Sequence, residues 1–140
     1  MAVFTAALYA RHSDKAVSVK GESTANGAAV VQWTFQDRDH QKWNLEATSD
    51  GYYVVRNVNS GKALSVNGES TANGAAIVQW DYAAKPHQEW RLVQKDAGFF
   101  GIQNRNSGQF LSVNQESLAD GATLVQWPGG NQPNQQFRLG

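Results

Sequence analysis

Three tryptophans recur at an interval of 47 residues, each at the end of a segment that the chain nearly repeats. The copies read SVKGESTANGAAVVQW from residue 18, SVNGESTANGAAIVQW from residue 65 and SVNQESLADGATLVQW from residue 112. An indole ring that faces solvent can stack on the apolar C–H face of a sugar ring, whereas a buried indole is a core residue. The alternation in VVQW does not say which face is buried. Both interpretations therefore remain open for Trp33, Trp80 and Trp127.

Polar side chains repeat around the same segments and could bind the hydroxyl groups of a ligand. A glutamate recurs in the polar loop of every copy, where it is either a solvated loop carboxylate or a hydroxyl-binding group. His40 and His87 occupy equivalent positions, and we expect surface histidines that can donate a hydrogen bond. Because they belong to different repeats, a shared metal site is not expected. The recurring glutamates are Glu22, Glu69 and Glu116.

A second set of aromatic residues follows the same interval. The triplets QKW, QEW and QQF begin at Gln41, Gln88 and Gln135. Their last position accepts either tryptophan or phenylalanine, an exchange that is typical of a buried side chain selected for its bulk. We therefore expect a core position for these aromatic rings and a largely structural glutamine beside them. The rings are those of Trp43, Trp90 and Phe137.

Short strands must position these residues. In the second copy GYYVVRN is an aromatic and β-branched run, and the turn sequence NSGK closes it. The runs ALSV, AAIVQW and HQEWRLV follow, separated by polar loops. An Asn-Gly or Asp-Gly pair in each long loop suits the positive φ angles of a tight hairpin turn. No segment shows sustained helical periodicity, so four strands per repeat, about twelve in all, are predicted.

The repeats fill the chain, at about residues 4–50, 51–97 and 98–140, and predict a single domain over residues 1–140. Two closed all-β architectures use units of this size. A β-propeller needs roughly four or more blades to close its ring, so three repeats would require more than one chain. A β-trefoil closes within one chain, with three four-stranded repeats around a pseudo-threefold axis. The all-β class is common to both.

Composition narrows the possible functions. Twelve basic and twelve acidic side chains give a formal net charge of zero. Proteins that bind nucleic acids or membrane surfaces usually carry an excess of basic side chains, which this chain lacks. The absence of cysteine excludes disulfides, cysteine-ligated zinc and thiol chemistry. No apolar run reaches the roughly 20 residues of a membrane span. The opening MAVFTAALYARHSD lacks a basic segment before its apolar run, so we interpret it as structure, consistent with a cytoplasmic protein or leaderless export.

The QxW-type triplets, each preceded by an NGAxVVQW-like segment and an LSV-like strand, resemble the ricin-type β-trefoil lectins and related carbohydrate-binding modules. The resemblance covers nearly the whole chain. It implies a β-trefoil with up to three equivalent shallow sites for galactose- or N-acetylgalactosamine-type sugars, and it favours tryptophan rings that face outward. It further implies a multivalent glycan-binding monomer or homodimer, with no enzymatic activity, no metal and no cofactor.

Transferred by position, the family site comprises an aspartate, an aromatic platform, an asparagine and the glutamine of the triplet. Serine replaces the aspartate in every repeat, which removes a charge-assisted hydrogen bond about twice as strong as a neutral one. Only the third repeat keeps the asparagine. The glutamates of the polar loops are then candidates to replace the missing carboxylate. The four positions fall on Ser18, Ser65 and Ser112; Trp33, Trp80 and Trp127; His40, His87 and Asn134; and Gln41, Gln88 and Gln135.

Two other functional classes are alternatives to a lectin. A catalytic site is normally one asymmetric cluster, and a glycosidase needs two carboxyl groups within about 5–10 Å. The repeated glutamates are expected to lie roughly 25 Å apart in a domain of this size, so no enzyme is predicted. The alternative is a β-trefoil protease inhibitor or protein-interaction module that uses irregular loops, with TFQDRDH (34–40) and PGGNQPN (128–134) as the most divergent candidates.

Overall fold

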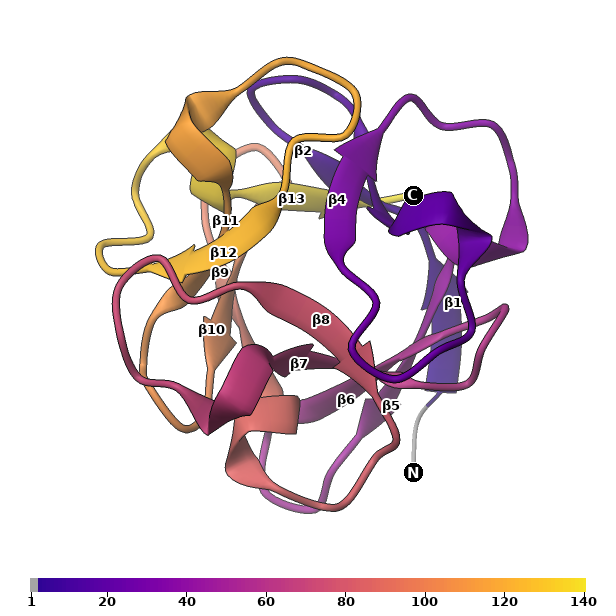
Figure 1. The fold of residues 1–140 in the computed structure, drawn as a ribbon. Coiled ribbons are helices and arrows are strands. Elements are labelled where there is room, and N and C mark those ends of the chain that lie inside the picture. The colour runs from indigo at the N-terminus through magenta and orange to yellow at the C-terminus, as the bar shows by residue number, and fades with distance from the viewer. Residues whose placement is uncertain (1–2) are drawn as a thin grey trace.

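The computed structural model describes residues 3–140, which form thirteen β-strands and six single-turn 3₁₀ helices in three similar units around a central axis (Figure 1). Among these residues there is no α-helix. The arrangement is a β-trefoil within one chain, which confirms the predicted fold and excludes the propeller. None of the helical turns in the described part of the chain is long and apolar enough to cross a membrane.

Each repeat contributes a similar series of strands. The first contains β1 (Val3–Ala6), β2 (Leu8–Ala10), β3 (Ala16–Val19), β4 (Val30–Trp33) and β5 (Trp43–Ala47). The second contains β6 (Tyr53–Asn57), β7 (Ala63–Val66), β8 (Ile77–Trp80) and β9 (Trp90–Gln94). The third contains β10 (Phe100–Asn104), β11 (Phe110–Val113), β12 (Leu124–Trp127) and β13 (Phe137–Leu139).

The first strand of the chain is divided in two, which gives one strand more than the sequence predicts. β1 pairs with β5, whereas β2 pairs with β13, so the strand changes partner between them. Ala7 lies at the change, where its N–H donates to the carbonyl of Gly140 and its carbonyl accepts from the N–H of Gly140, both at 2.9 Å. The last residue of the chain is therefore hydrogen-bonded to the point where β1 gives way to β2.

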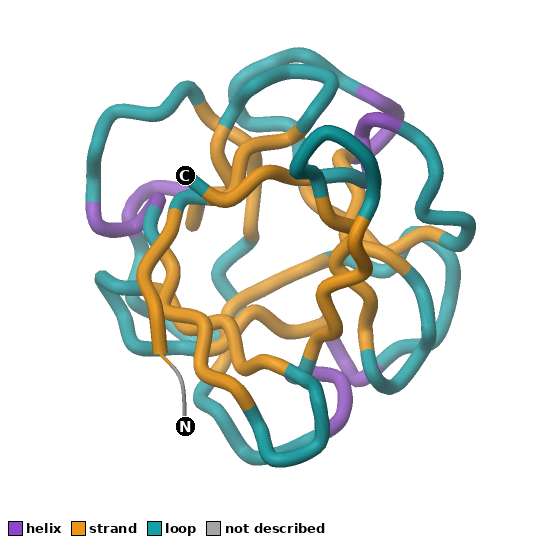
Figure 2. The backbone as a smooth tube through the Cα atoms, turned by 180° about the vertical axis from the view of Figure 1, so that it is seen from behind, coloured by secondary structure: helices purple, strands orange, loops and turns teal. Residues whose placement is uncertain are grey.

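The strands pair edge to edge in the order β1-β5-β6-β9-β10-β13-β2 and enclose the core, as the ring of strands in Figure 2 shows. The remaining strands form the hairpins β3–β4, β7–β8 and β11–β12, which cover one end of this ring (Figure 1). β4, β8 and β12 approach one another around the axis through single bridges, such as Ala29 to Val78. These hairpins carry the repeated segments that end in VQW, whereas the aromatic residues of the triplets begin β5, β9 and β13.

The aromatic residues of the triplets occupy the core, as predicted. Trp43, Trp90 and Phe137 have no exposed surface. The indole Nε1 of Trp43 donates to the carbonyl of Val17 at 2.9 Å, and Trp90 donates to Leu64 at the same distance. Phenylalanine has no such donor to satisfy, so the third repeat fills the same position with an apolar ring and needs no partner for an N–H group.

A buried glutamine before each platform tryptophan ties neighbouring repeats together. The Nε2 of Gln79 donates to the carbonyls of Ser23 and Ala25 in the first repeat, both at 2.9 Å. Its Oε1 accepts from the hydroxyl of Ser60 at 2.8 Å. Gln32 and Gln126 make the equivalent bonds to the third and second repeats. The VQW motif therefore buries its glutamine and leaves the following ring outside.

The Asn-Gly and Asp-Gly pairs do not form the tight two-residue turns that their sequence suggests. The connection from β7 to β8 contains η3 (Asn67–Glu69) before it reaches Gly74, and only the glycine of the pair has a positive φ, at 81°. Equivalent turns precede the other loops. In the first and third repeats these turns are η1 (Lys20–Glu22) and η5 (Asn114–Glu116). A second 3₁₀ turn follows each hairpin and precedes the triplet aromatic residue; these turns are η2 (Asp39–Gln41), η4 (Pro86–Gln88) and η6 (Pro133–Gln135).

Candidate functional site

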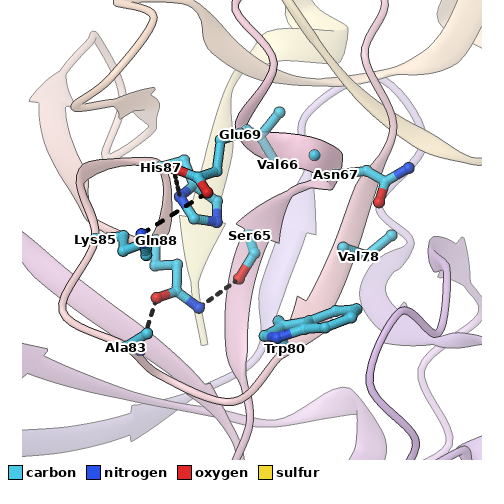
Figure 3. A pocket seen from close by; sticks show the side chains of 11 residues that line it. Ser65, Val66, Asn67, Glu69, Val78, Trp80, Ala83, Lys85, His87 and Gln88 are labelled. Carbon is cyan, nitrogen blue, oxygen red and sulfur yellow. Dashed lines mark hydrogen bonds and ion pairs between the residues drawn. The ribbon is translucent and has the colours of Figure 1, made fainter.

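Every repeat forms a cavity between the 3₁₀ turn after its second hairpin strand and the tryptophan that ends the hairpin. The cavities have volumes of about 280, 310 and 510 Å³ in the first, second and third repeats. In the second cavity, Trp80 lies on one side, Ser65 at the centre and the His87–Glu69 pair on the other side (Figure 3). Gln88 also lines this cavity.

The predicted site residues gather in the same way in the other repeats. The third cavity is lined by all five of its candidates, Ser112, Glu116, Trp127, Asn134 and Gln135. The first is lined by Ser18, Glu22, Trp33 and His40, but Gln41 is not among its lining residues. The candidate residues of each repeat therefore line one cavity, with the exception of Gln41 in the first repeat.

The platform tryptophans are exposed at the edge of the cavities. Trp33, Trp80 and Trp127 have 40, 46 and 50% of their surface exposed, which is the outward orientation that the resemblance favours. The covered part of each ring lies against a glycine of another repeat. A Cβ atom at Gly27 would lie 3.4 Å from the Trp80 ring, and the same relation joins Gly121 to Trp33 and Gly74 to Trp127.

In two of the three cases, the residue before the glycine also accepts a hydrogen bond from the backbone of the other repeat. The Oδ1 of Asn26 accepts from the backbone N–H of Asp81 at 2.9 Å, directly after Trp80. Asp120 accepts from the backbone N–H of Thr34 at 2.8 Å, directly after Trp33. In the third repeat the residue after Trp127 is Pro128, which has no N–H group to donate. The platforms of the first two repeats therefore have one more anchor.

The serine and glutamine positions hold each other. The hydroxyl of Ser65 donates to the carbonyl of Ala63 at 2.9 Å and accepts from Nε2 of Gln88 at 3.2 Å. Gln88 also donates to the carbonyl of Asp81 at 2.9 Å and accepts from the N–H of Ala83 at 2.8 Å. Both amide protons of Gln88 are thus engaged, and the same pattern recurs at Gln41 and Gln135. This geometry suits a positioning role, as the sequence suggests for these glutamines.

The prediction of surface histidines is wrong. His40 and His87 are each only 8% exposed, because η2 and η4, which carry them, pack against β3 and β7. Burial lowers the pKa of both imidazoles; Glu22 and Glu69 oppose this by raising it, with Glu Oε1 atoms 3.9 and 3.8 Å from the respective Nδ1 atoms. The histidines are therefore neutral at neutral pH.

Each cavity keeps one buried polar atom without a partner. The Nδ1 atoms of His40 and His87 have no hydrogen bond within the described chain. In the third repeat, Asn134 donates from Nδ2 to the carbonyl of Val113 at 2.9 Å, and its Oδ1 has no partner. A buried polar group without a hydrogen bond costs about 1–3 kcal/mol. Each of these atoms has less than 1 Å² of accessible surface, so a ligand hydroxyl would reach it after a small movement of the side chain.

Several residues that line the cavities were not predicted from the sequence. Lys20, Asn67 and Asn114 occupy one equivalent wall position, and the difference between Lys20 and Asn67 is visible as one of two changes between the first two copies. The divergent loops proposed for protein interaction turn out to be walls of the first and third cavities. Residues from 128 to 132 enlarge the third, and they are Pro128, Gly129, Asn131 and Gln132.

A fourth cavity, of about 440 Å³, is lined by residues of β5, β6 and neighbouring loops, and each of its three carboxylates contacts one of its two arginines. Arg105 contacts Asp50 at 2.6 Å and Glu89 at 2.9 Å, and Arg56 contacts Glu46 at 3.0 Å. No cluster of three or more metal-ligating side chains occurs within residues 3–140. The three repeated cavities are therefore the better candidates for a ligand site.

Comparison with known proteins agrees with this geometry. The family model described as ricin-type beta-trefoil lectin domain-like matches residues 5–80 and 86–140. The designed threefold-symmetric protein ThreeFoil is 41% identical with a TM-score of 0.95, and the match covers 96% of each chain. The exo-β-1,3-galactanase 1,3Gal43A of Clostridium thermocellum is 31% identical with a TM-score of 0.94, over 96% of this chain but 29% of the galactanase.

More distant structures share the fold. The ricin B-like lectin of Macrolepiota procera, solved in complex with lactose, is 16% identical with a TM-score of 0.84, and the match covers 97% of this chain and 94% of the lectin. A comparison with curated protein sequences gave no significant match. Since the family model covers nearly all of the sequence and the three cavities repeat with it, the chain belongs to the ricin-type β-trefoil lectin domain-like family.

Proposed function

We propose that this protein is a carbohydrate-binding lectin that takes one galactose- or N-acetylgalactosamine-type sugar in each of its three cavities. The observation that carries the proposal is a combination found in every repeat. An exposed indole ring shares a cavity with a buried polar atom that has no partner, on His40, His87 or Asn134. A pyranose offers an apolar face for the first and hydroxyl groups for the second.

The proposed contacts divide between stacking and hydrogen bonding. Trp33, Trp80 and Trp127 stack on the sugar ring. The histidines or Asn134 bind one hydroxyl, and the serine hydroxyl at the cavity wall offers a further acceptor. The carboxylate of the polar loop accepts from a hydroxyl pair in place of the family aspartate, and the triplet glutamine holds the serine. The carboxylates are those of Glu22, Glu69 and Glu116.

The choice of sugar rests on relatives. The similar structures include a galactanase at 31% identity and a more distant lectin in complex with lactose, a sugar that contains galactose. Without the family aspartate, each site has few strong contacts, so we expect millimolar affinity for a monosaccharide, about −4 kcal/mol. Three cavities in separate repeats can engage several glycans on one surface, with an avidity gain of about 10²–10⁴ where geometry permits.

The cavities support binding better than catalysis. Each is lined by a single carboxylate, whereas glycoside hydrolysis needs two carboxyl groups about 5–10 Å apart. Neutral hydroxyl recognition by side chains also requires no metal ion. We therefore propose a non-enzymatic, metal-independent protein whose partners are glycans or glycoconjugates and which acts as a monomer or homodimer.

A glycan array printed with multivalent galactosides and N-acetylgalactosaminides, read with and without EDTA, tests the proposal. We expect binding that survives EDTA and is lost when Trp33, Trp80 and Trp127 are all replaced by Ala. Absence of binding to every multivalent glycan, or loss of binding in EDTA, would contradict it. Protease-inhibition assays on the same preparation test the alternative that loops 34–40 and 128–134 bind a protein.

A further inference from the structure

The three cavities differ in the charges on their walls, although their platforms and serines are alike. Position by position, Lys20 in the first cavity corresponds to Asn67 and Asn114 in the others. The cation beside the loop carboxylate also changes, from Arg38 through Lys85 to the neutral Gln132. The glutamate is present in all three. The three cavities therefore have similar walls but differ in the charges that would surround a bound ligand.

The loop carboxylates of the first two cavities are already neutralised by a partner. Arg38 contacts Glu22 at 3.5 Å, and Lys85 contacts Glu69 at 3.9 Å. Glu116 forms no ion pair within residues 3–140. The second cavity is thus electrically balanced, and the third carries one surplus negative charge.

Lys20 gives the first cavity a positive charge at a wall position where the other two cavities have a neutral asparagine. It lines the cavity, is exposed, and forms neither an ion pair nor a side-chain hydrogen bond with the described residues. Arg38 and Asp39 are both exposed, neither is one of the lining residues, and their opposite charges both act on His40, so they offset each other outside the cavity. Solvent screens such an outlying charge more than one on the wall, since the Debye length is about 8 Å at physiological salt.

We propose that the first cavity is selective for a sugar that carries an anionic substituent, a sulfate ester or a carboxylate, which pairs with the ammonium group of Lys20. The inference rests on the proposed function of the same sites. An ammonium group is a point charge without the planar geometry that favours carboxylates, so both kinds of substituent fit. The second cavity takes neutral sugars, and the third disfavours acidic ones through Glu116.

The exposed indoles allow the three sites to be observed separately. We would titrate ¹⁵N-tryptophan-labelled protein with galactose, galactose 3-sulfate and galacturonic acid, and follow the indole N–H signals of Trp33, Trp80 and Trp127 at low ionic strength. The buried Trp43 and Trp90 serve as internal references. For wild-type protein we expect the Trp33 signal to show about fivefold tighter binding of at least one acidic sugar than of galactose, the size of one exposed ion pair.

Reciprocal substitutions isolate the charge. In Lys20→Asn the ratio of acidic-sugar to galactose affinity at Trp33 should fall about fivefold, and in Asn67→Lys the ratio at Trp80 should rise about fivefold. Both variants should fold, because the backbone before the turn is nearly the same with either residue, at φ −86° and ψ 127° for Val19 and φ −88° and ψ 128° for Val66. Arg91→Asn removes a positive charge outside the cavities and controls for net charge.

The outcomes separate the two proposals. If galactose shifts none of the three platform signals, the proposed lectin function fails. If galactose binds but neither acidic sugar prefers the first cavity, or if the ratio is the same in both reciprocal variants as in wild-type, the charge inference alone is overturned. Inorganic sulfate provides the last arm: a response at Trp33 as strong as that to the sulfated sugar would show an anion site without sugar selectivity, and would overturn it too.

Discussion

Gly27, in the first repeat, lies against the indole ring of Trp80, in the second, so closely that a Cβ atom there would lie 3.4 Å from Cζ3 of the ring. Gly74 and Gly121 have the same relation to Trp127 and Trp33. Each candidate sugar platform is thus supported by a loop of another repeat. A substitution in one loop should therefore be felt in a cavity that its own repeat does not form.

Gly27→Ala tests this relation. The glycine has a φ of 86°, which an L side chain rarely adopts, so we expect the free energy of unfolding to fall by about 1 kcal/mol. The new methyl group would touch the Trp80 ring at the near limit of van der Waals contact, so a loop shift that relieves the backbone strain would displace the ring. Sugar affinity should therefore fall in the second cavity and remain unchanged in the first. Urea denaturation and indole-resolved titration measure the two effects.

Gly51→Ala is the matched control for that variant. Gly51 has a φ of 90°, but a Cβ atom there would meet nothing within 4 Å. It should lose a similar amount of stability while all three cavities keep their affinity. Equal sugar binding by the Gly27 and Gly51 variants would show that the contact with Trp80 does not matter for the platform.

Platform and core tryptophans should respond differently to truncation. Trp80→Ala should abolish binding in the second cavity and lower stability by about 1 kcal/mol, because the ring is 46% exposed. Trp90→Ala should cost about 3–5 kcal/mol, the usual range for a fully buried aromatic ring. Thermal melts and glycan titrations of both variants provide the measurement. A Trp80 variant that melts as early as the Trp90 variant would contradict the assignment of a platform.

Gln115 stands where the first two repeats have glycine. Its φ is 55°, and Gly21 and Gly68 have φ values of 65° and 66° at the equivalent positions. Gln115→Gly should therefore raise the free energy of unfolding by about 0.5–1 kcal/mol. The reverse change, Gly68→Gln, should lower it by a similar amount, since a Cβ atom there meets nothing within 4 Å and only the backbone is strained. Chemical denaturation decides whether the two variants move in opposite directions.

The buried histidines should make the protein less stable in mild acid. Burial holds the pKa of His40 and His87 below the ordinary value of 6.5, so the unfolded chain binds protons at a higher pH than the folded chain does. Stability is then lost as the pH falls from about 6.5 through the folded pKa values. A His40→Asn/His87→Asn variant, which copies Asn134, should lose less stability over this window. Identical stability profiles for the variant and wild-type would contradict the effect.

The sequence was sufficient for the fold because its evidence is local and repeated. The interval shared by the triplets and the VQW segments predicts three equivalent units, and the exchange of Phe137 for tryptophan predicts the core position. His40 illustrates the limit. Its burial depends on how η2 packs against β3, which follows from the closed fold and not from the polarity of neighbouring residues. The same is true of the supporting glycines, since Gly121 and Trp33 are far apart in the chain.

The support between repeats has a cyclic order: the first repeat supports the second, the second supports the third, and the third supports the first. A cycle of this kind has no first member, and Ala7 and Gly140 already lie hydrogen-bonded side by side. Circular permutation, with a linker that runs from Gly140 back to the start of β1 and new termini between two repeats, would preserve every such contact. Deletion of one repeat would instead leave one ring without its glycine and one glycine without its ring, so only the whole closed trefoil supports every platform that it contains.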